Sequence, residues 1–129
     1  MAVARVLVVD DEPGVLDVCS RTLRRHGFQV TTASNAQTAR ILLQAGAVDL
    51  LITDIRMPHE SGLSLLHTVH KIAPDLPLMI MTGYPDNAVV DTALNLNVRS
   101  FIVKPFDLTD FVNEVRRSLG LDSRNGNQS

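Results

Sequence analysis

Short apolar runs alternate along this chain with segments of helical periodicity. The apolar runs, rich in Val, Leu, Ile and Met, predict five strands over residues 4–9, 28–33, 49–53, 78–81 and 100–103. Apolar side chains recur at helical spacing over residues 14–26, 35–45, 61–71, 86–96 and 107–119. Regular alternation of strand and helix is typical of a parallel sheet with helices on both faces. We therefore predict an α/β fold built from five strand–helix units.

The second apolar run differs from the other four. The others are nearly uninterrupted, which is typical of strands buried on both faces of a parallel sheet. The second run contains Thr31 and Thr32, so we expect it at an edge. Ser34, just after it, is the expected N-cap of the second helix.

The first predicted helix carries an apolar stripe that defines its buried face. Val15, Val18, Cys19 and Leu23 recur at helical spacing, and Gly27 ends the helix in a left-handed conformation. A lone cysteine on such a stripe packs as a small hydrophobic side chain. Cys19 is therefore predicted to be part of the core.

The composition limits both the size and the partners of the domain. The chain has 129 residues, about one domain's worth, and a formal net charge of −2. It has no cluster of basic residues, so direct binding to nucleic acid is not expected. No apolar run approaches the roughly 18 residues of a membrane span, and we expect a cytoplasmic location. Residues 1–121 are expected to form the domain, and residues 122–129 a disordered tail or the start of a linker.

Acidic side chains follow the ends of two predicted strands. Asp10, Asp11 and Glu12 follow the first strand, and Asp54 follows the third. Parallel strands lie about 4.8 Å apart, so Asp10 or Asp11 would face Asp54 if these strands are neighbours. Carboxylates at that separation need a cation to stay ionised together, and hard oxygen ligands suit Mg²⁺. The sequence therefore predicts a Mg²⁺ site at this edge of the sheet.

A hydroxyl and an amine follow two further strands. Thr82 comes after the fourth strand and Lys104 after the fifth. The long stem of Lys104 can bring a point charge to a phosphoryl group near Asp54. Together with the carboxylates, these groups predict a site for a phosphorylated aspartate.

Four segments resemble one known family in order and spacing. They are Val-Val-Asp-Asp-Glu at 8–12, Thr-Asp-Ile-Arg-Met-Pro at 53–58, Met-Thr-Gly at 81–83 and Phe-Ile-Val-Lys-Pro-Phe at 101–106. They resemble the receiver domain of bacterial two-component response regulators, of which the chemotaxis response regulators are examples. The resemblance covers residues 3 to about 119. It implies a flavodoxin-like, doubly wound fold with a five-stranded parallel sheet in the order 2-1-3-4-5.

The resemblance implies a role for each residue at the strand ends. Asp54 would accept a phosphoryl group from a histidine kinase or a histidine phosphotransfer protein, and Thr82 and Lys104 would bind that group. The peptide bond between Lys104 and Pro105 would be cis. The chain would be a phosphoacceptor switch whose only chemistry is its own phosphorylation and dephosphorylation, rather than an enzyme.

The metal site implied by the resemblance draws on two loops. Asp10, Asp11 and Asp54 would hold Mg²⁺ together with the backbone carbonyl of Arg56. Asp10 would act through a water molecule.

The resemblance also implies how the signal leaves the site. Phe101 would turn inward when Thr82 moves, which changes the face formed by the fourth helix, fifth strand and fifth helix. This face bears Asp91, Arg99 and Asp110, and a homodimer through it is one expectation. The sequence holds no output domain, so the downstream partner stays unnamed.

Two large side chains flank the line along which water would approach the phosphorus atom. They are Arg56, two residues after Asp54, and Tyr84, two residues after Thr82. In the family these positions tune hydrolysis, and large side chains here predict slow self-dephosphorylation.

Two other functions remain open at this stage. A Mg²⁺-dependent phosphatase of the phosphoaspartate type would place an acid/base Asp two residues after its nucleophile, where this chain has Arg56 after Asp54. An FMN-binding flavodoxin-like module would need a phosphate loop after the first strand, where acidic residues would repel phosphate. His67 and His70 lie at i, i+3 on one helix without a third ligand, so we expect a solvated face there.

Overall fold

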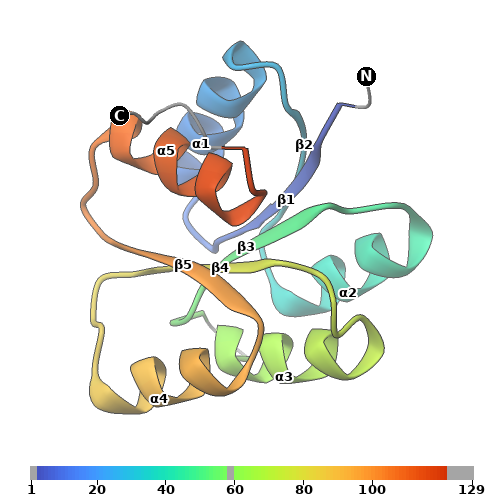
Figure 1. The fold of residues 1–129 in the computed structure, drawn as a ribbon, viewed down its shortest axis with the longest axis vertical. Coiled ribbons are helices and arrows are strands. Elements are labelled where there is room, and N and C mark those ends of the chain that lie inside the picture. Colours follow the sequence, from blue (N-terminus) through green and yellow to red (C-terminus); the bar gives the residue numbers. More distant parts are fainter. Residues whose placement is uncertain (1–2, 58–59, 122–129) are drawn as a thin grey trace.

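A computed structural model describes residues 3–57 and 60–121 of the chain (Figure 1). The strands are β1 (Arg5–Val9), β2 (Gln29–Ala33), β3 (Leu50–Asp54), β4 (Leu78–Thr82) and β5 (Val98–Val103). The helices are α1 (Pro13–Arg25), α2 (Ala36–Ala45), α3 (Gly62–Ile72), α4 (Asn87–Asn95) and α5 (Leu108–Ser118). The five predicted strand–helix units are thus confirmed. The expected tail at 122–129 lies outside the described residues.

The five strands form one parallel sheet in the order β2-β1-β3-β4-β5, as expected. Helices α1 and α5 cover one face, and α2, α3 and α4 cover the other (Figure 1). Because the strands are parallel, their carboxyl ends all lie at the same end of the sheet, which we call its carboxyl edge. The register pairs Val9 with Thr53 and Thr82 with Val103, which brings the residues after these strands together.

The sheet has two edge strands; the apolar pattern identified one of them, and the strand order implied by the resemblance gave both. β2 is at an edge, as its threonines predicted. β5 is at the other edge. The expectation that it is buried on both faces is wrong, because its burial is incomplete. Phe101 is half-buried and Val103 is 45% exposed. An edge strand has a neighbour on one side only, and its apolar run did not reveal this position.

Two predictions for the first two helices are corrected by the structure, one on a helix end and one on a buried side chain. The N-cap of α2 is Asn35, whose side chain accepts a hydrogen bond from the backbone N–H of Thr38, instead of Ser34. Gly27 has a φ of +90°, the left-handed conformation predicted for it. Val18 was expected in the core but is 43% exposed, because the buried face of α1 is narrower than the predicted stripe.

Two hydrophobic cores lie on opposite faces of the sheet. We call them the α1/α5 core and the α2/α4 core after the helices that enclose them. The first includes Val8, Cys19, Leu23, Ile52, Met81, Phe111 and Val115, and the second Leu7, Ala39, Leu51, Leu65, Leu66, Ile80 and Val89. Successive β1 residues alternate between the cores, as strand geometry requires. Cys19 is fully buried, as predicted.

No helix within the described residues is long and apolar enough to cross a membrane.

Candidate functional site

Three carboxylates and one ammonium group meet at the carboxyl edge of the sheet. Nζ of Lys104 lies 2.6 Å from Oδ2 of Asp10, 2.8 Å from Oδ2 of Asp54 and 3.1 Å from Oε1 of Glu12. Asp10 is fully buried, Asp54 is nearly so, and Glu12 is exposed. Lys104 comes from the end of β5, two strands away from β3, so its long stem supplies the reach that the sequence predicted.

The electrostatics of the cluster favour the charged form of Lys104 and disfavour the ionised form of Asp10. Burial raises the pKa of Asp10, and the hydrogen bond from Lys104 offsets this only in part. Burial alone would lower the pKa of Lys104, but its hydrogen bonds to Asp10, Asp54 and Glu12 outweigh burial and raise that pKa. Lys104 is therefore protonated at neutral pH and is the cation that holds the carboxylates together.

Backbone donors fix the orientation of both buried carboxylates. Oδ1 of Asp10 accepts a hydrogen bond of 2.9 Å from the N–H of Glu12, and Oδ1 of Asp54 accepts one of 3.2 Å from the N–H of Arg56. Each carboxylate thus uses one oxygen for its own loop and turns the other toward Lys104.

Thr82 lies on the neighbouring strand with its hydroxyl already bonded. Its Oγ1 accepts a hydrogen bond of 3.0 Å from the N–H of Tyr84, and its carbonyl accepts one of 2.8 Å from the N–H of Lys104. The Lys104–Pro105 peptide bond is cis, as expected. The loops after β4 and β5 are therefore joined beside Asp54.

Asp11 and Glu12 are both exposed in the loop after β1, and Glu12 joins the acidic cluster. Asp11 is exposed, whereas Glu12 contributes a carboxylate oxygen that lies within 4.8 Å of those of Asp10 and Asp54. The hydrogen bond from the Glu12 backbone to Asp10 turns residues 10 and 12 toward the same side. The role of Asp11 as a metal ligand stays a prediction, and Glu12 is an acidic neighbour to which the sequence assigned no role.

The donor set of this cluster fits a hard divalent cation. Three carboxylate oxygens from Asp10, Glu12 and Asp54 are close enough together to be shared by one ion. With a single lysine among them, the cluster retains excess negative charge, and oxygen-only ligands are those that Mg²⁺ prefers. His67 and His70 do not belong to any group of potential metal ligands in the described part of the chain.

The side chain of Arg56 connects the loops after β3 and β4. Its Cζ lies 4.6 Å from the centre of the Tyr84 ring, and its Nη2 lies 3.9 Å from Oδ2 of Asp86. A guanidinium over an aromatic ring is attracted by the electron density of the ring face. The two side chains that the sequence placed beside the approach of water are thus in contact with each other, and their role in hydrolysis stays a prediction.

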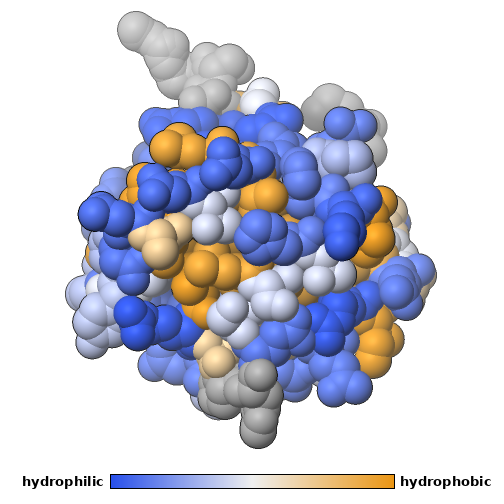
Figure 2. All heavy atoms as spheres, turned by 90° about the horizontal axis from the view of Figure 1, so that it is seen from below, coloured by the Kyte–Doolittle hydropathy of each residue, from blue (hydrophilic) through white to orange (hydrophobic). Residues whose placement is uncertain are grey.

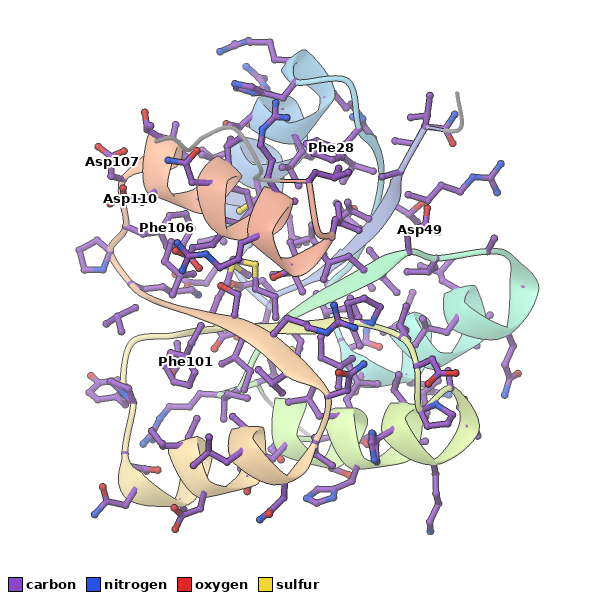
Figure 3. The ribbon with its side chains drawn as sticks, in the orientation of Figure 1. Phe28, Asp49, Phe101, Phe106, Asp107 and Asp110 are labelled. Carbon is purple, nitrogen blue, oxygen red and sulfur yellow. The ribbon has the colours of Figure 1, made fainter. Side chains whose placement is uncertain are left out.

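Phe101 packs on the α2/α4 side of the sheet. Figure 3 shows it beside β5 on the side of α4, whereas Phe106 lies toward α5. The ring of Phe106 stacks on Phe111 with centroids 5.2 Å apart. The predicted switch residue therefore lies on the face of the sheet that α4 covers.

Comparison with known proteins gives one consistent result. The family described as response regulator receiver domain matches residues 6–116. The chain is 36% identical over 119 residues to the DNA-binding transcriptional regulator NtrC of Azospirillum brasilense, and 33% identical over 122 residues to the regulatory protein AtoC of Escherichia coli (strain K12). These matches cover 92% and 95% of this chain but 25% and 26% of those proteins. The chain thus spans about a quarter of the length of the curated relatives it matches.

Solved structures agree with the sequence matches. A CheY-like response regulator receiver domain protein from Methanospirillum hungatei JF-1 has a TM-score of 0.89 and 26% identity, covering 97% of this chain and 100% of that one. The response regulator protein TrrA from Thermotoga maritima, in complex with Mg²⁺ and BeF, has a TM-score of 0.82 and 29% identity, covering 90% of this chain and 99% of that one.

Proposed function

The chain belongs to the family of response regulator receiver domains of two-component systems, and on that premise we propose that Asp54 is its phosphoacceptor. A receiver domain is a phosphoacceptor switch and not a classical enzyme. The observation that carries the proposal is the contact of Lys104 Nζ with Oδ2 of both Asp54 and Asp10, at 2.8 and 2.6 Å. Neither the phosphatase nor the FMN-binding alternative accounts for this arrangement together with the family match.

The proposed reaction uses the carboxylate of Asp54 as the nucleophile. One of its oxygens forms a bond to the phosphorus atom of a phosphohistidine on a histidine kinase or phosphotransfer protein. The P–N bond breaks, and its electron pair goes to the ring nitrogen of the donor histidine. Lys104 and the hydroxyl of Thr82 then donate hydrogen bonds to the oxygens of the phosphoryl group; the Thr82 oxygen accepts the N–H of Tyr84 and keeps its own proton free to donate.

Mg²⁺ is the cofactor that we propose for this site. Asp10, Asp54 and the backbone carbonyl of Arg56 would hold it, with Asp11 or Glu12 as the further acidic group. When bound, Mg²⁺ supplies positive charge that offsets the oxygens of the incoming phosphoryl group. Receiver domains in general bind Mg²⁺, and the acidic cluster of Asp10, Glu12 and Asp54 supports the same here.

A hollow beside Lys104 offers a docking place for the phosphodonor protein. It has a volume of about 540 Å³ and is lined by α1, the loop after β5 and the start of α5, including Val15, Val18, Phe106 and Leu108. Val18 and Leu108 are exposed apolar side chains at its rim. We propose that the kinase or phosphotransfer protein covers these side chains as its phosphohistidine approaches Asp54.

The output that we propose passes through Thr82 and Phe101 to the face formed by α4, β5 and α5. Movement of Thr82 toward the phosphoryl group would leave space for Phe101 to rotate inward. This face would then bind a downstream protein, an output domain or a second copy of the chain. We propose further that the receiver domain ends near residue 121, that it acts in the cytoplasm, and that it does not itself contact nucleic acid.

Phosphorylation with a small donor tests the assignment of Asp54. We expect labelled acetyl phosphate with Mg²⁺ to modify the wild-type protein and to leave Asp54→Asn unmodified, because an amide is not a nucleophile. Asp11→Ala and Glu12→Ala, compared side by side, show which acidic neighbour supports Mg²⁺ binding. Uptake of one acid-stable phosphate by Asp54→Asn would refute the site.

We propose also that Arg56 and Tyr84 slow the loss of the phosphoryl group by covering the approach of water. Their contact at 4.6 Å supports this role. Arg56 cannot act as a general base, because its guanidinium stays protonated. After removal of the donor, Arg56→Asn with Tyr84→Glu should lose its label faster than the wild-type protein, and equal decay rates would rule out shielding.

A further inference from the structure

The loop between β3 and α3 leaves the site at Asp54 and returns against it at Gly62. The N–H of Gly62 donates a hydrogen bond of 2.8 Å to the carbonyl of Ile55. A Cβ atom on Gly62 would lie 2.0 Å from the carbonyl oxygen of Asp54 and 2.9 Å from Cα of Ile55. The first residue of α3 is therefore in direct contact with the backbone of the phosphoacceptor, so any displacement of this helix end is transmitted to Asp54.

An ion pair outside the acidic cluster holds this end of α3. Nη1 of Arg40, on α2, lies 2.5 Å from Oε2 of Glu60, which also accepts a hydrogen bond of 3.0 Å from the hydroxyl of Ser64. Ser61, between Glu60 and the helix, caps α3 by accepting a hydrogen bond from the N–H of Ser64. Glu60, just before α3, thus connects the first turn of α3 to α2.

This ion pair differs from other pairs on the surface. The Arg40 and Glu60 side chains are 32% and 27% exposed, whereas those of Arg21 and Asp17, an i, i+4 pair within α1, are 71% and 58% exposed. The hydrogen bond from Arg40 lowers the pKa of Glu60. Arg40 and Glu60 come from different elements, so their contact fixes α2 relative to the loop after β3.

We propose that Arg40 and Glu60 are positioning residues for phosphorylation: by holding the start of α3 against the backbone of Asp54, they keep its carboxylate within reach of Lys104. This inference rests on the proposed function. The contacts run from Arg40 to Glu60 and from Glu60 to Ser64 in the first turn of α3, and Gly62, the first residue of that helix, lies against the backbone of Asp54. Within the acidic site, the hydrogen bond from Arg56 N–H to Asp54 Oδ1 reports whether the carboxylate is held in place.

The test removes the ion pair and measures both the rate of labelling and the amide resonance of Arg56. Arg40→Met should reduce the rate of labelling by acetyl phosphate at saturating Mg²⁺ about tenfold, because small displacements of a nucleophile have large kinetic effects. The amide resonance of Arg56 should shift in the same variant without any donor. Arg21→Met, which breaks the ion pair between an arginine and an aspartate on α1, is the control and should change neither quantity.

A charge swap separates positioning from a general loss of stability. Arg40→Glu combined with Glu60→Arg rebuilds the pair in reverse and should restore both the labelling rate and the Arg56 resonance, whereas Glu60→Arg alone should not. An unchanged rate and resonance in Arg40→Met, or a loss that the swap fails to restore, would overturn the proposal. If Arg40→Met does not fold, Arg40→Lys, which keeps the charge, and the swap decide it. A wild-type protein that acetyl phosphate fails to label would instead refute the proposed function, while the Arg56 resonance would still test positioning.

Discussion

Helices α4 and α5 flank the same edge strand from opposite faces of the sheet, yet they are anchored very differently. α5 buries Phe111, Val112 and Val115. α4 buries Val89 alone and leaves Leu94 78% exposed. Figure 2 views the molecule from the side of α3 and α4 in Figure 1, and apolar side chains are visible among the polar ones on that surface. α5 is thus an integral part of its core, and α4 is a lightly attached cover.

The difference indicates which element can move. Each buried side chain contributes roughly 1.5–3 kcal/mol, so α4 has far less holding it in place than α5. Elements that move in regulation are drawn from the less stable parts of a protein. Phe101 lies on the α4 face, so its proposed rotation would disturb the less firmly anchored of these two helices. Four tests would contradict this difference in anchoring between α4 and α5 or make it quantitative.

Core truncation should give the largest contrast. Phe111→Ala in α5 should destabilise the fold by about 3–5 kcal/mol, because it leaves a cavity in the α1/α5 core. Val89→Ala in α4 should reduce the free energy of unfolding by about 1–2 kcal/mol, because it removes two methyl groups. Urea denaturation measures both, and equal losses would contradict the idea that α4 is lightly anchored.

Cys19 gives a pH-dependent contrast between the two faces. Burial in the α1/α5 core raises the pKa of its thiol from about 9 to about 12. The folded state therefore keeps a proton that the unfolded chain loses, so stability contributed below pH 9 is lost as the pH rises toward 12. The loss attributable to Cys19 is about 1.4 kcal/mol per pH unit in this window.

The controls for this prediction move the thiol to the other face. Cys19→Ala should lack this part of the pH dependence in urea denaturation. Cys19→Ala combined with Leu94→Cys places the thiol on exposed α4, where it should not restore the slope. A slope that persists in Cys19→Ala would assign it to other groups.

Loss of the N-cap of α4 and loss of the N-cap of α5 should affect different measurements, local hydrogen exchange for α4 and global unfolding for α5. Asp86 caps α4 by accepting a hydrogen bond from the N–H of Val89, and Asp107 caps α5 by accepting from Thr109 and Asp110. Either change to Ala removes about 1 kcal/mol. For Asp107→Ala we expect this in global unfolding, and for Asp86→Ala in faster hydrogen exchange of α4 amides with the global free energy nearly unchanged. Identical behaviour of the two variants would argue against a separately opening α4.

The smallest effect is expected at the most exposed apolar side chain. Leu94→Ser should change the free energy of unfolding by less than about 0.5 kcal/mol, since Leu94 contributes little to the α2/α4 core. A loss above 1 kcal/mol in dilute protein would mean that Leu94 is covered in solution. Repeating the measurement at high protein concentration tests whether a second copy provides the cover.

Features with a local cause were predictable from the sequence. Strand ends were predictable because parallel strands place their following residues at one edge, which identified Asp10, Asp54, Thr82 and Lys104 as neighbours. The choice between Asp10 and Asp11 was not predictable, because it depends on how the loop after β1 turns. The N–H of Glu12 bonds to Asp10 and sets that turn.

Contacts between distant parts of the chain were missed because no local sequence pattern encodes them. Arg40 and Glu60 are twenty residues apart on different elements, and no periodicity relates them. The apolar run of β5 resembles that of a central strand, so its own pattern did not indicate an edge; the strand order that the resemblance implied did. The contact of Gly62 with the Asp54 backbone likewise arises from the path of a loop and has no sequence spacing of its own.

The contact between Arg56 and Tyr84 has an optical consequence. Tyr84 is the one tyrosine in the chain, and the sequence contains no tryptophan. Ultraviolet emission excited at the tyrosine band therefore comes from a single ring, which lies under a guanidinium near the proposed phosphorylation site. Any event that separates the two side chains changes the surroundings of that one fluorophore. The unlabelled protein therefore carries its own reporter, next to the proposed site for Mg²⁺ and the phosphoryl group.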